Sequence, residues 1–330
     1  MFQHPAGVSL QALGNISQIY DQRGVAGSGR EASVGAFDIV PLYVDPGHTN
    51  ASDDADGTSP LQPKATLQSA INSSLLAQNG VIYVSGAITE SVIVPPTVVP
   101  DVAIIGVGGS IDFPTWTAAT AAGTALTVRQ SGWLIAGFRF EPGALGTSIT
   151  LQWVPGSGYV ANRTVISNNY FDGLYQGQYG ITLSGAPYDV QITNNEFREY
   201  TDGASGAFAI IVTDSSNANP YMCMICDNVF WENDNHIGSL GDNKSFNLSI
   251  FKGNVFHEGL GISATRILDL RGGSQGKNIV TENTFCGDYS NTGGYYAHAG
   301  APGMWVGNIA EDVAEAEVGD NGFTVAVPAA

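Results

Sequence analysis

Short apolar runs recur along the second half of the chain, and each is followed by an asparagine and usually, two places later, by an aromatic residue. The segments read TVISNNYF, VQITNNEF, CMICDNVF, SIFKGNVF, NIVTENTF and a degenerate last copy, MWVGNIA. Their asparagines are Asn169, Asn195, Asn228, Asn254, Asn283 and Asn308, at spacings of 26, 33, 26, 29 and 25 residues. A self-similar period in this range is typical of a solenoid.

The composition of the repeat favours strands over helices. Asn, Gly, Ser and Thr punctuate every copy, and the apolar runs are short and rich in β-branched residues. Most units hold a second apolar run, such as residues 181–183, 209–212 and 267–270. Two or three short strands per repeat describe one coil of a parallel β-helix, so we predict an all-β, single-chain solenoid.

The register of the repeats predicts which side chains form the interior. Alternate side chains of a strand share a face, and coils lie ~4.8 Å apart, so like residues should stack along the axis. The asparagine is expected at the bend between strands, where Asn tolerates left-handed backbone and its amide can bond turn backbone. We therefore interpret two sets as a structural ladder rather than a site: Asn169, Asn195, Asn228, Asn254 and Asn283, and Phe171, Phe197, Phe230, Phe256 and Phe285.

Earlier residues predict the first coils and a cap. Residues 133–140 read as a degenerate repeat, and residues 81–84, 92–94 and 102–106 read as strands. Residues 66–76 have the apolar spacing of a helix. An open solenoid end exposes core and unpaired backbone, so this short helix is expected to cap the N-terminal end.

The stretch from Tyr43 to Ser91, YVDPGHTNASDDADGTSP…ATLQSAI…GVIYVSGAITES, resembles the opening of right-handed, pectate-lyase-like parallel β-helix proteins. Together with the Asn-x-Phe coils, the resemblance covers residues 40 to 310. It implies a right-handed helix. It leaves function open, because the family includes polysaccharide lyases, glycoside hydrolases, bacterial adhesins and phage tailspikes.

The expected organisation is an N-terminal arm (1–38), a β-helix (39–310) and a C-terminal tail with one last strand (311–330). The arm matches no repeat and is too small to fold alone. We expect it to dock on a partner, such as another virion protein, or on a neighbouring copy. By analogy with phage spikes of this fold, the chain is expected to be a homotrimer.

Charge limits the partners. The formal net charge is −18 with only 12 Lys plus Arg, which disfavours nucleic acid and anionic membranes. An anionic polysaccharide would need a bridging cation such as Ca²⁺. The N-terminus lacks the features of a signal peptide, and nothing approaches 18 consecutive apolar residues. We expect assembly in a host cytoplasm and no cofactor other than Ca²⁺.

Enzyme motifs of the family are missing: there is no N-T-D, no D-D on a repeat strand, no G-H-G and no R-I-K. Asp54 and Asp56, in the loop that begins with Asp53, faintly resemble a calcium loop without its distal Glu. The favoured interpretation is that this is a solvated loop and not a calcium site.

Three glutamates recur two places after the repeat phenylalanine: Glu199, Glu232 and Glu258. In register they would stack along one edge at separations that suit glycosidase carboxylates, and a solvated turn would look the same. The residues nearby in sequence, which are candidates for a sugar-binding shelf, are Trp231, Asp234, His236 and His257.

Asp269 and Arg271 share a strand face and could form a structural ion pair or, less readily, supply a lyase base. With Arg266 they are expected to make the only cationic cluster on the repeats.

The leading hypothesis is a structural protein of a phage virion, either a tailspike-like appendage or a capsid-surface decoration, that binds host glycans. The alternative is a polysaccharide lyase or glycoside hydrolase, and a third is an adhesin. The missing motifs favour a role without catalysis.

Overall fold

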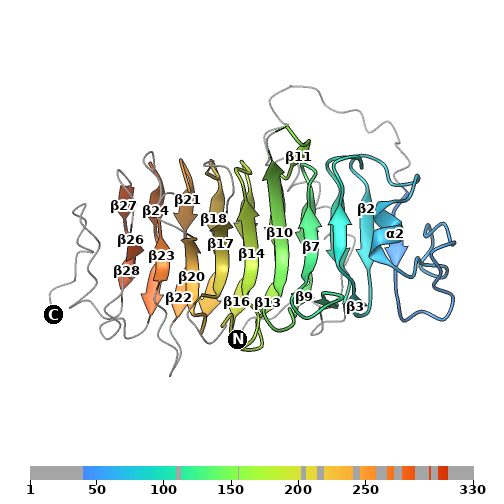
Figure 1. Cartoon of the computed structure of the whole chain (residues 1–330), viewed down its shortest axis with the longest axis horizontal. Coiled ribbons are helices and arrows are strands. Elements are labelled where there is room, and N and C mark those ends of the chain that lie inside the picture. The colour runs from blue at the N-terminus through green and yellow to red at the C-terminus, as the bar shows by residue number, and fades with distance from the viewer. Residues whose placement is uncertain are drawn as a thin grey trace.

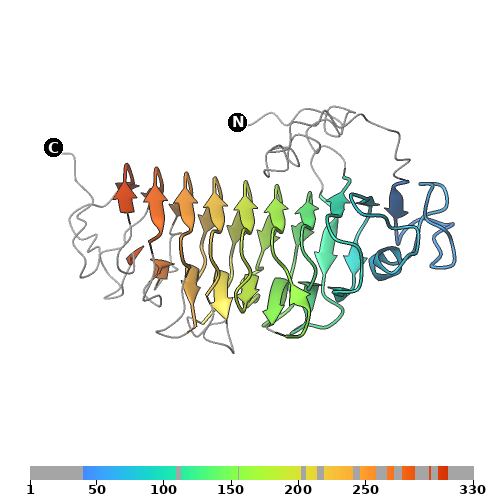
Figure 2. The same cartoon turned by 90° about the horizontal axis from the view of Figure 1, so that it is seen from above.

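The chain forms an elongated parallel β-solenoid whose coils follow one another along the long axis (Figures 1 and 2). The computed structural model describes residues 40–108, 113–154, 156–201, 206–213, 219–240, 246–257, 266–270, 277–286, 297–298 and 304–310. The predicted arm (1–38) and tail (311–330) lie outside the described residues.

Three parallel sheets form the walls. Sheet 1 contains β1 (Leu42–Val44), β2 (Val81–Val84), β5 (Ala103–Gly106), β8 (Leu134–Ala136), β12 (Val165–Ser167), β15 (Gln191–Thr193), β18 (Met224–Cys226), β21 (Ile250–Lys252), β24 (Ile279–Thr281) and β27 (Met304–Val306). Sheet 2 contains β3 (Ile88–Thr89), β6 (Thr115–Thr117), β9 (Arg139–Phe140), β13 (Tyr170–Asp172), β16 (Glu196–Arg198), β19 (Val229–Trp231), β22 (Val255–His257), β25 (Thr284–Cys286) and β28 (Ile309–Ala310). Sheet 3 contains β4 (Val92–Val94), β7 (Thr124–Val128), β10 (Thr147–Val154), β14 (Tyr179–Ser184), β17 (Phe208–Thr213), β20 (Asn235–Ser239), β23 (Arg266–Asp269) and β26 (Ala297–His298), and β11 (Tyr159–Val160) pairs antiparallel with β10. The all-β, right-handed parallel β-helix expected from the repeats and the resemblance is confirmed.

The repeat phenylalanines form one continuous stack inside sheet 2. Neighbouring rings from Phe140 to Phe285 lie 4.5 to 5.1 Å apart with planes within 12° of parallel. Trp116 extends the stack by one coil, at 5.3 Å from Phe140. Residues 133–140 are therefore an earlier copy of the repeat, as predicted.

The repeat asparagines form a buried ladder between sheets 1 and 2. From Asn169 to Asn308, the backbone N–H and Nδ2 of each asparagine both donate to Oδ1 of the next, at 2.9 to 3.1 Å. Nδ2 also reaches back to a strand carbonyl of the preceding coil, for example from Asn195 to Ile166. The ladder thus satisfies bend backbone that strand pairing leaves free.

The prediction that these asparagines adopt left-handed backbone is wrong. The residue immediately before each one does so: Asn168, Asn194, Asp227, Gly253, Glu282 and Gly307, with φ between 56° and 68°. Turning the chain one residue earlier leaves the ladder side chain pointing inward, where its neighbours in the adjacent coils lie within hydrogen-bond distance.

A short helix, α2 (Leu67–Ile71), lies at the N-terminal end of the solenoid (Figure 1). Its buried residues Leu67, Ala70 and Ile71 join the core, and Thr66 accepts a hydrogen bond from the N–H of Ser69 as N-cap. The helix ends five residues earlier than predicted. Asn72 is its C-cap, and the next residue, Ser73, bonds the N–H of Leu75 with its hydroxyl, which competes with helix continuation. No helix in the described part is long and apolar enough to cross a membrane.

Candidate functional site

The outer side of sheet 2 carries a row of arginine and aromatic side chains. In each three-residue strand the phenylalanine points inward, so the residues immediately before and after it point outward. We call the polar and aromatic outward side chains over β9 to β22, without the outward valines of β19 and β22, the arginine–aromatic face. Its members are Arg139, Glu141, Tyr170, Asp172, Glu196, Arg198, Trp231 and His257.

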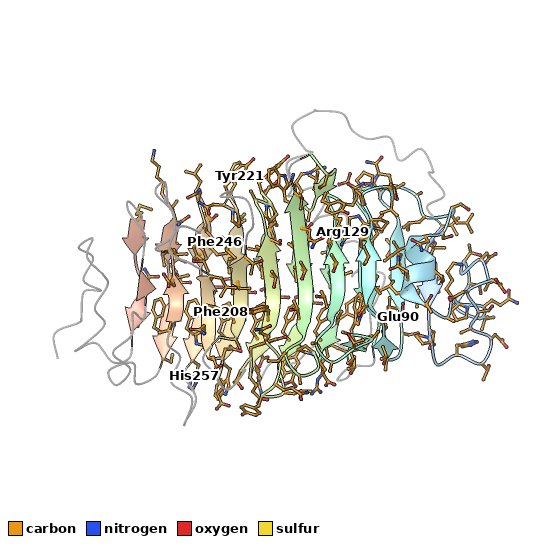
Figure 3. The ribbon with its side chains drawn as sticks, viewed as in Figure 1. Glu90, Arg129, Phe208, Tyr221, Phe246 and His257 are labelled. Carbon is orange, nitrogen blue, oxygen red and sulfur yellow. The ribbon has the colours of Figure 1, made fainter. Side chains whose placement is uncertain are left out.

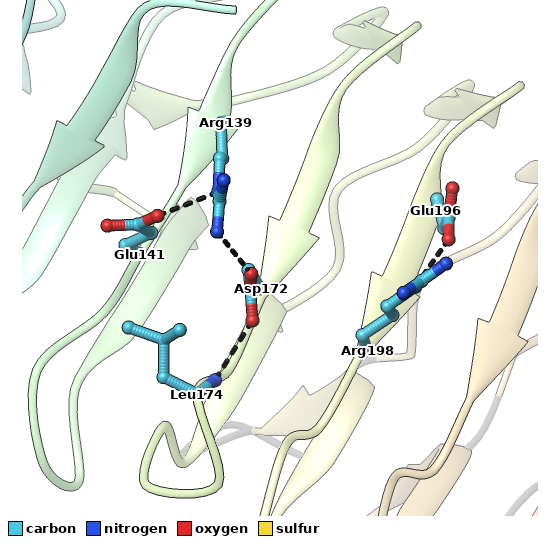
Figure 4. A network of polar contacts seen from close by, with 6 residues as sticks. All are labelled: Arg139, Glu141, Asp172, Leu174, Glu196 and Arg198. Atoms are coloured by element: carbon cyan, nitrogen blue, oxygen red, sulfur yellow. Dashed lines mark hydrogen bonds and ion pairs between the residues drawn. The ribbon is translucent and has the colours of Figure 1, made fainter. Parts of the chain in front are cut away.

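Both arginines of this face are paired with carboxylates (Figure 4). Arg139 contacts Glu141 at 2.7 Å through Nε and Asp172 at 2.7 Å through Nη2, so it joins two coils. Arg198 pairs with Glu196 in its own strand. The positive charges are therefore neutralised locally, and the arginine planes are held in fixed orientations.

Planar groups follow one another across the coils. The guanidinium carbons of Arg139 and Arg198 each lie 5.5 Å from the centre of the Tyr170 ring, and that of Arg198 lies 5.8 Å from Trp231. Trp231 stacks on His257 with ring centres 4.0 Å apart and planes 2° from parallel. Burial by these neighbours raises the pKa of Tyr170. The result is a partly exposed platform that spans five coils, from β9 to β22.

A groove of about 280 Å³ runs beside this platform, at the bend between sheets 1 and 2. It is lined by the left-handed residues Asn168, Asn194 and Asp227 and by Tyr170 and Glu196. Amide and carboxylate groups thus line the groove together with the aromatic rings of Tyr170 and Phe113. Such a mixture of a flat apolar surface and hydrogen-bonding groups suits a polyhydroxylated ligand.

At the other edge of the face, a tyrosine joins two of the predicted glutamates. Glu199 and Glu232 occupy equivalent turn positions in adjacent coils, both with left-handed backbone. The Tyr175 hydroxyl donates to Oε2 of Glu232 at 2.7 Å, and Glu199 lies near enough to this hydroxyl for its pKa to be influenced by it. We call these three residues the acidic corner. Glu258, the third predicted glutamate, lies outside the described residues.

Electrostatics differ between the members of the acidic corner. Partial burial raises the pKa of Glu199, although the bond from Tyr175 opposes this, and the charges of Asp172 and Glu232 add to it. The bond to Glu232 raises the pKa of Tyr175, so its phenol stays protonated. The corner therefore holds a carboxyl of raised pKa beside a second carboxyl.

Of the four residues predicted to form a sugar-binding shelf, the structure brings Trp231 and His257 together. Asp234 is partly buried, after β19. The expectation for His236 is wrong: it is fully buried on β20, where it packs against the stacked rings of Phe230 and Phe256 at 5.7 Å from each. Burial, with a smaller contribution from His257, lowers the pKa of His236 to about 3.

The predicted cluster of Arg266, Asp269 and Arg271 does not form a described site. Asp269 lies on β23 of sheet 3 and is 4% exposed, so it is not on an accessible face. Arg271 and the side chain of Arg266 lie outside the described residues. Arg139 and Arg198 are two further repeat arginines that sequence reasoning did not group, and both lie against Tyr170.

The acidic loop near the N-terminus is organised by its own donors. Asp56 accepts from the N–H and hydroxyl of Thr58, and Asp53 accepts from Thr66 and Ser69 at the helix start. The ammonium of Lys64 donates to the carbonyls of Asp53 and Ala55 at 3.2 and 2.8 Å. Nothing in the described part groups three or more His, Cys, Asp or Glu side chains in a way that could hold a metal ion.

Sequence reasoning missed most of the arginine–aromatic face. The available signal was the alternation around the phenylalanine, which marks Tyr170, Arg139 and Arg198 as outward residues in neighbouring coils. Tyr175 had no such signal, because only the turn after β13 brings its hydroxyl to a glutamate 57 residues away.

No protein-family model matches the chain, and no curated protein matches it. Among solved structures, it is similar to an alginate lyase from Paenibacillus sp. str. FPU-7, with a TM-score of 0.46 and 14% identity over 74% of this chain and 95% of that one. It is also similar to ORF18 of Geobacillus virus E2, with a TM-score of 0.28 and 12% identity over 88% of this chain and 66% of that one. Neither likeness assigns an activity to this chain.

Proposed function

We propose that the protein is a glycan-binding structural component of a phage virion, of the tailspike or capsid-decoration kind. The observation that carries the binding role is the partly exposed platform of Tyr170, Arg198, Trp231 and His257 beside a groove lined with amides and carboxylates. The virion role extends the resemblance seen in the sequence, and a rigid solenoid is well suited to present such a platform.

The charges of the face favour a neutral glycan over a polyuronate. Arg139 and Arg198 are already paired with carboxylates, so neither is free to neutralise a substrate carboxylate. Glu199 and Glu232 add negative charge at one edge, and the whole chain carries −18. A uronate chain would meet repulsion along this surface.

Binding of the intact protein to a panel of neutral and uronate polysaccharides tests this proposal. Trp231→Ala should weaken binding to the recognised neutral glycan by about tenfold or more, because a stacking aromatic is a dominant contact in such sites. Tyr159→Ala is the matched control, since Tyr159 lies on β11 of another face. The proposal would be contradicted if Trp231→Ala and Tyr159→Ala bound the neutral glycan equally well, or if the protein bound only uronate polysaccharides. Co-purification with phage particles tests the virion role separately.

The acidic corner supports a second candidate, a glycoside hydrolase. A carboxyl with a raised pKa next to another carboxyl is the arrangement that hydrolases use as acid and nucleophile or base, and Glu199 and Glu232 have this relationship. Release of reducing ends from the bound glycan, abolished in both Glu199→Gln and Glu232→Gln, would establish it. Binding without release would leave the structural role.

A further inference from the structure

Sheet 1 has an outward row that is apolar in nearly every coil. The cross-strand pairs place these residues side by side: Val81, Ala103, Leu134, Val165, Met224, Ile250, Ile279 and Met304. Among the described coils from β2 on, Gln191 is the one polar member. The inward neighbours of these residues already form the core. Ala103, Leu134 and Val165 are at most 3% exposed and form a small buried cluster of their own, so the exposed part of this apolar row lies over the later coils.

The most exposed apolar part of this surface before the last coil lies over β18 and β21. We call it the methionine patch and define it as Tyr221, Met222, Met224, Leu248 and Ile250. Met222 and Leu248 are 48% and 53% exposed. Figure 3 places Tyr221 at the edge of the solenoid opposite His257, so the patch is separate from the arginine–aromatic face.

Two members of the patch stand on strained backbone. Met222 and Leu248 have φ of 56° and 50°, at a bend where earlier coils have Asp101, Gly132, Arg163 and Asp189. Left-handed backbone costs a residue with a side chain about 1 kcal/mol, and Gly or Asp is better suited to it. Large apolar side chains here add strain and gain no burial within the solenoid, which points to a use outside it.

The chain itself contains a complementary segment. Residues 1–20 include no Lys, Arg, Asp or Glu, although the whole chain carries −18. Apolar residues recur there every three places, at Leu10, Leu13, Ile16 and Ile19. Such a segment presents an apolar side without charges, which matches an apolar patch that includes adaptable methionines.

The segment can reach the patch of its own solenoid. The chain enters sheet 1 at β1, which is six strands from β18 in the sheet order, a distance of about 29 Å at ~4.8 Å per strand. The intervening residues 21–39 can span up to about 60 Å when extended. A tether of this length gives an effective concentration in the millimolar range, which favours the patch of the same chain over that of another copy.

We propose that residues 1–20 dock on the methionine patch of the same chain. This gives the segment an intramolecular place instead of the contact with a partner expected from the sequence. The proposal does not depend on glycan binding or on a virion role.

Methionine oxidation by dilute hydrogen peroxide, followed by mass spectrometry, tests the proposal on the full chain. Met222 and Met224 should oxidise about threefold or more slowly in the full chain than in a variant lacking residues 1–20, because oxidation follows exposure. Met304 lies two coils beyond Ile250 in the same row and is the internal reference, with equal rates in both.

A pair of full-length variants separates loss of docking from misfolding of the deletion variant. Leu13→Asp/Ile16→Asp should raise the oxidation rates of Met222 and Met224 as the deletion does. Gln11→Asp/Gln18→Asp adds the same charge between the apolar positions and should leave them low. Equal rates in all proteins would overturn the proposal. Protection that disappears on hundredfold dilution would also overturn it, because the segment would then belong to a second copy.

Discussion

The inner and outer sides of sheet 2 are made by the same three-residue strands, and they differ in how strictly they repeat. The inward residue is phenylalanine in every coil from Phe140 to Phe285. The outward residue after it is different each time, namely Glu141, Asp172, Arg198, Trp231, His257 and Cys286. Stacking at ~4.8 Å demands like neighbours inside, and no such demand acts outside. Regularity therefore marks the scaffold, and the irregular side is where recognition can develop.

The largest effect should come from interrupting the interior stack. Phe230 lies 5.0 Å from Phe197 and 4.9 Å from Phe256 and is fully buried. Phe230→Ala leaves a cavity between two rings and should lower the free energy of unfolding by about 3–5 kcal/mol. Urea denaturation measures this. Val229→Ala, at the outward neighbour, is the control with a loss below about 1 kcal/mol. Similar losses of stability in Phe230→Ala and Val229→Ala would mean that the inner and outer sides of sheet 2 contribute equally to the scaffold.

The asparagine ladder should come next. Asn195→Ala removes the acceptor of both the N–H and Nδ2 of Asn169, and the donor to the Ile166 carbonyl. One or two buried groups left unsatisfied should cost about 2–4 kcal/mol. The adjacent Asn194 is exposed with φ of 56°, so Asn194→Gly keeps the backbone and should change stability by less than about 0.5 kcal/mol. A neutral Asn195→Ala would mean that water replaces the ladder.

These two elements were predictable because their signal is local and repeated. A phenylalanine two places after each asparagine determines face, register and stacking together. The left-handed residue before the asparagine was not identified, since Asn, Asp, Gly and Glu all occupy it. His236 was misplaced because it lies on β20, outside the Asn-x-Phe phrase, where no repeat defines the inward side. Tyr175 depends on a turn, whose path the strand pattern does not determine.

His236 places a titratable group inside the regular interior, and this makes stability depend on pH. Its pKa is lowered to about 3 by burial, so the unfolded chain binds the extra proton first as pH falls. The contribution of His236 to the free energy of unfolding is therefore constant above the ordinary histidine pKa of about 6.5. As pH falls from that value to about 3, the folded state loses at most about 1.4 kcal/mol of stability per pH unit.

The variant His236→Met isolates this dependence from the titration of carboxylates. Methionine is similar in size and can adapt its shape to the space beside the stacked rings of Phe230 and Phe256. The difference in the free energy of unfolding between the two proteins should shift in favour of the variant by about 2.5 kcal/mol on going from pH 7 to pH 4.5, as followed by urea titrations at each pH. A constant difference across this range would place His236 in contact with solvent, and the interior of β19 and β20 would then be less closed than its stacking implies.

The smallest effect should come from the outer side of sheet 2. Arg139 makes two ion pairs and lies against Tyr170, yet its side chain is 42% exposed. One partner, Asp172, is only 8% exposed, but it keeps a hydrogen bond from the N–H of Leu174. Pairs with an exposed member contribute about 0–1 kcal/mol, so Arg139→Gln should lower stability by about 1 kcal/mol, and by less in high salt. Urea midpoints at low and high ionic strength measure both effects. A loss as large as that of Asn195→Ala would show that Arg139 supports the coil-to-coil packing, and the outer side would then be scaffold as well. A small loss keeps the outer residues free to vary from coil to coil, because changing them leaves the interior stack intact.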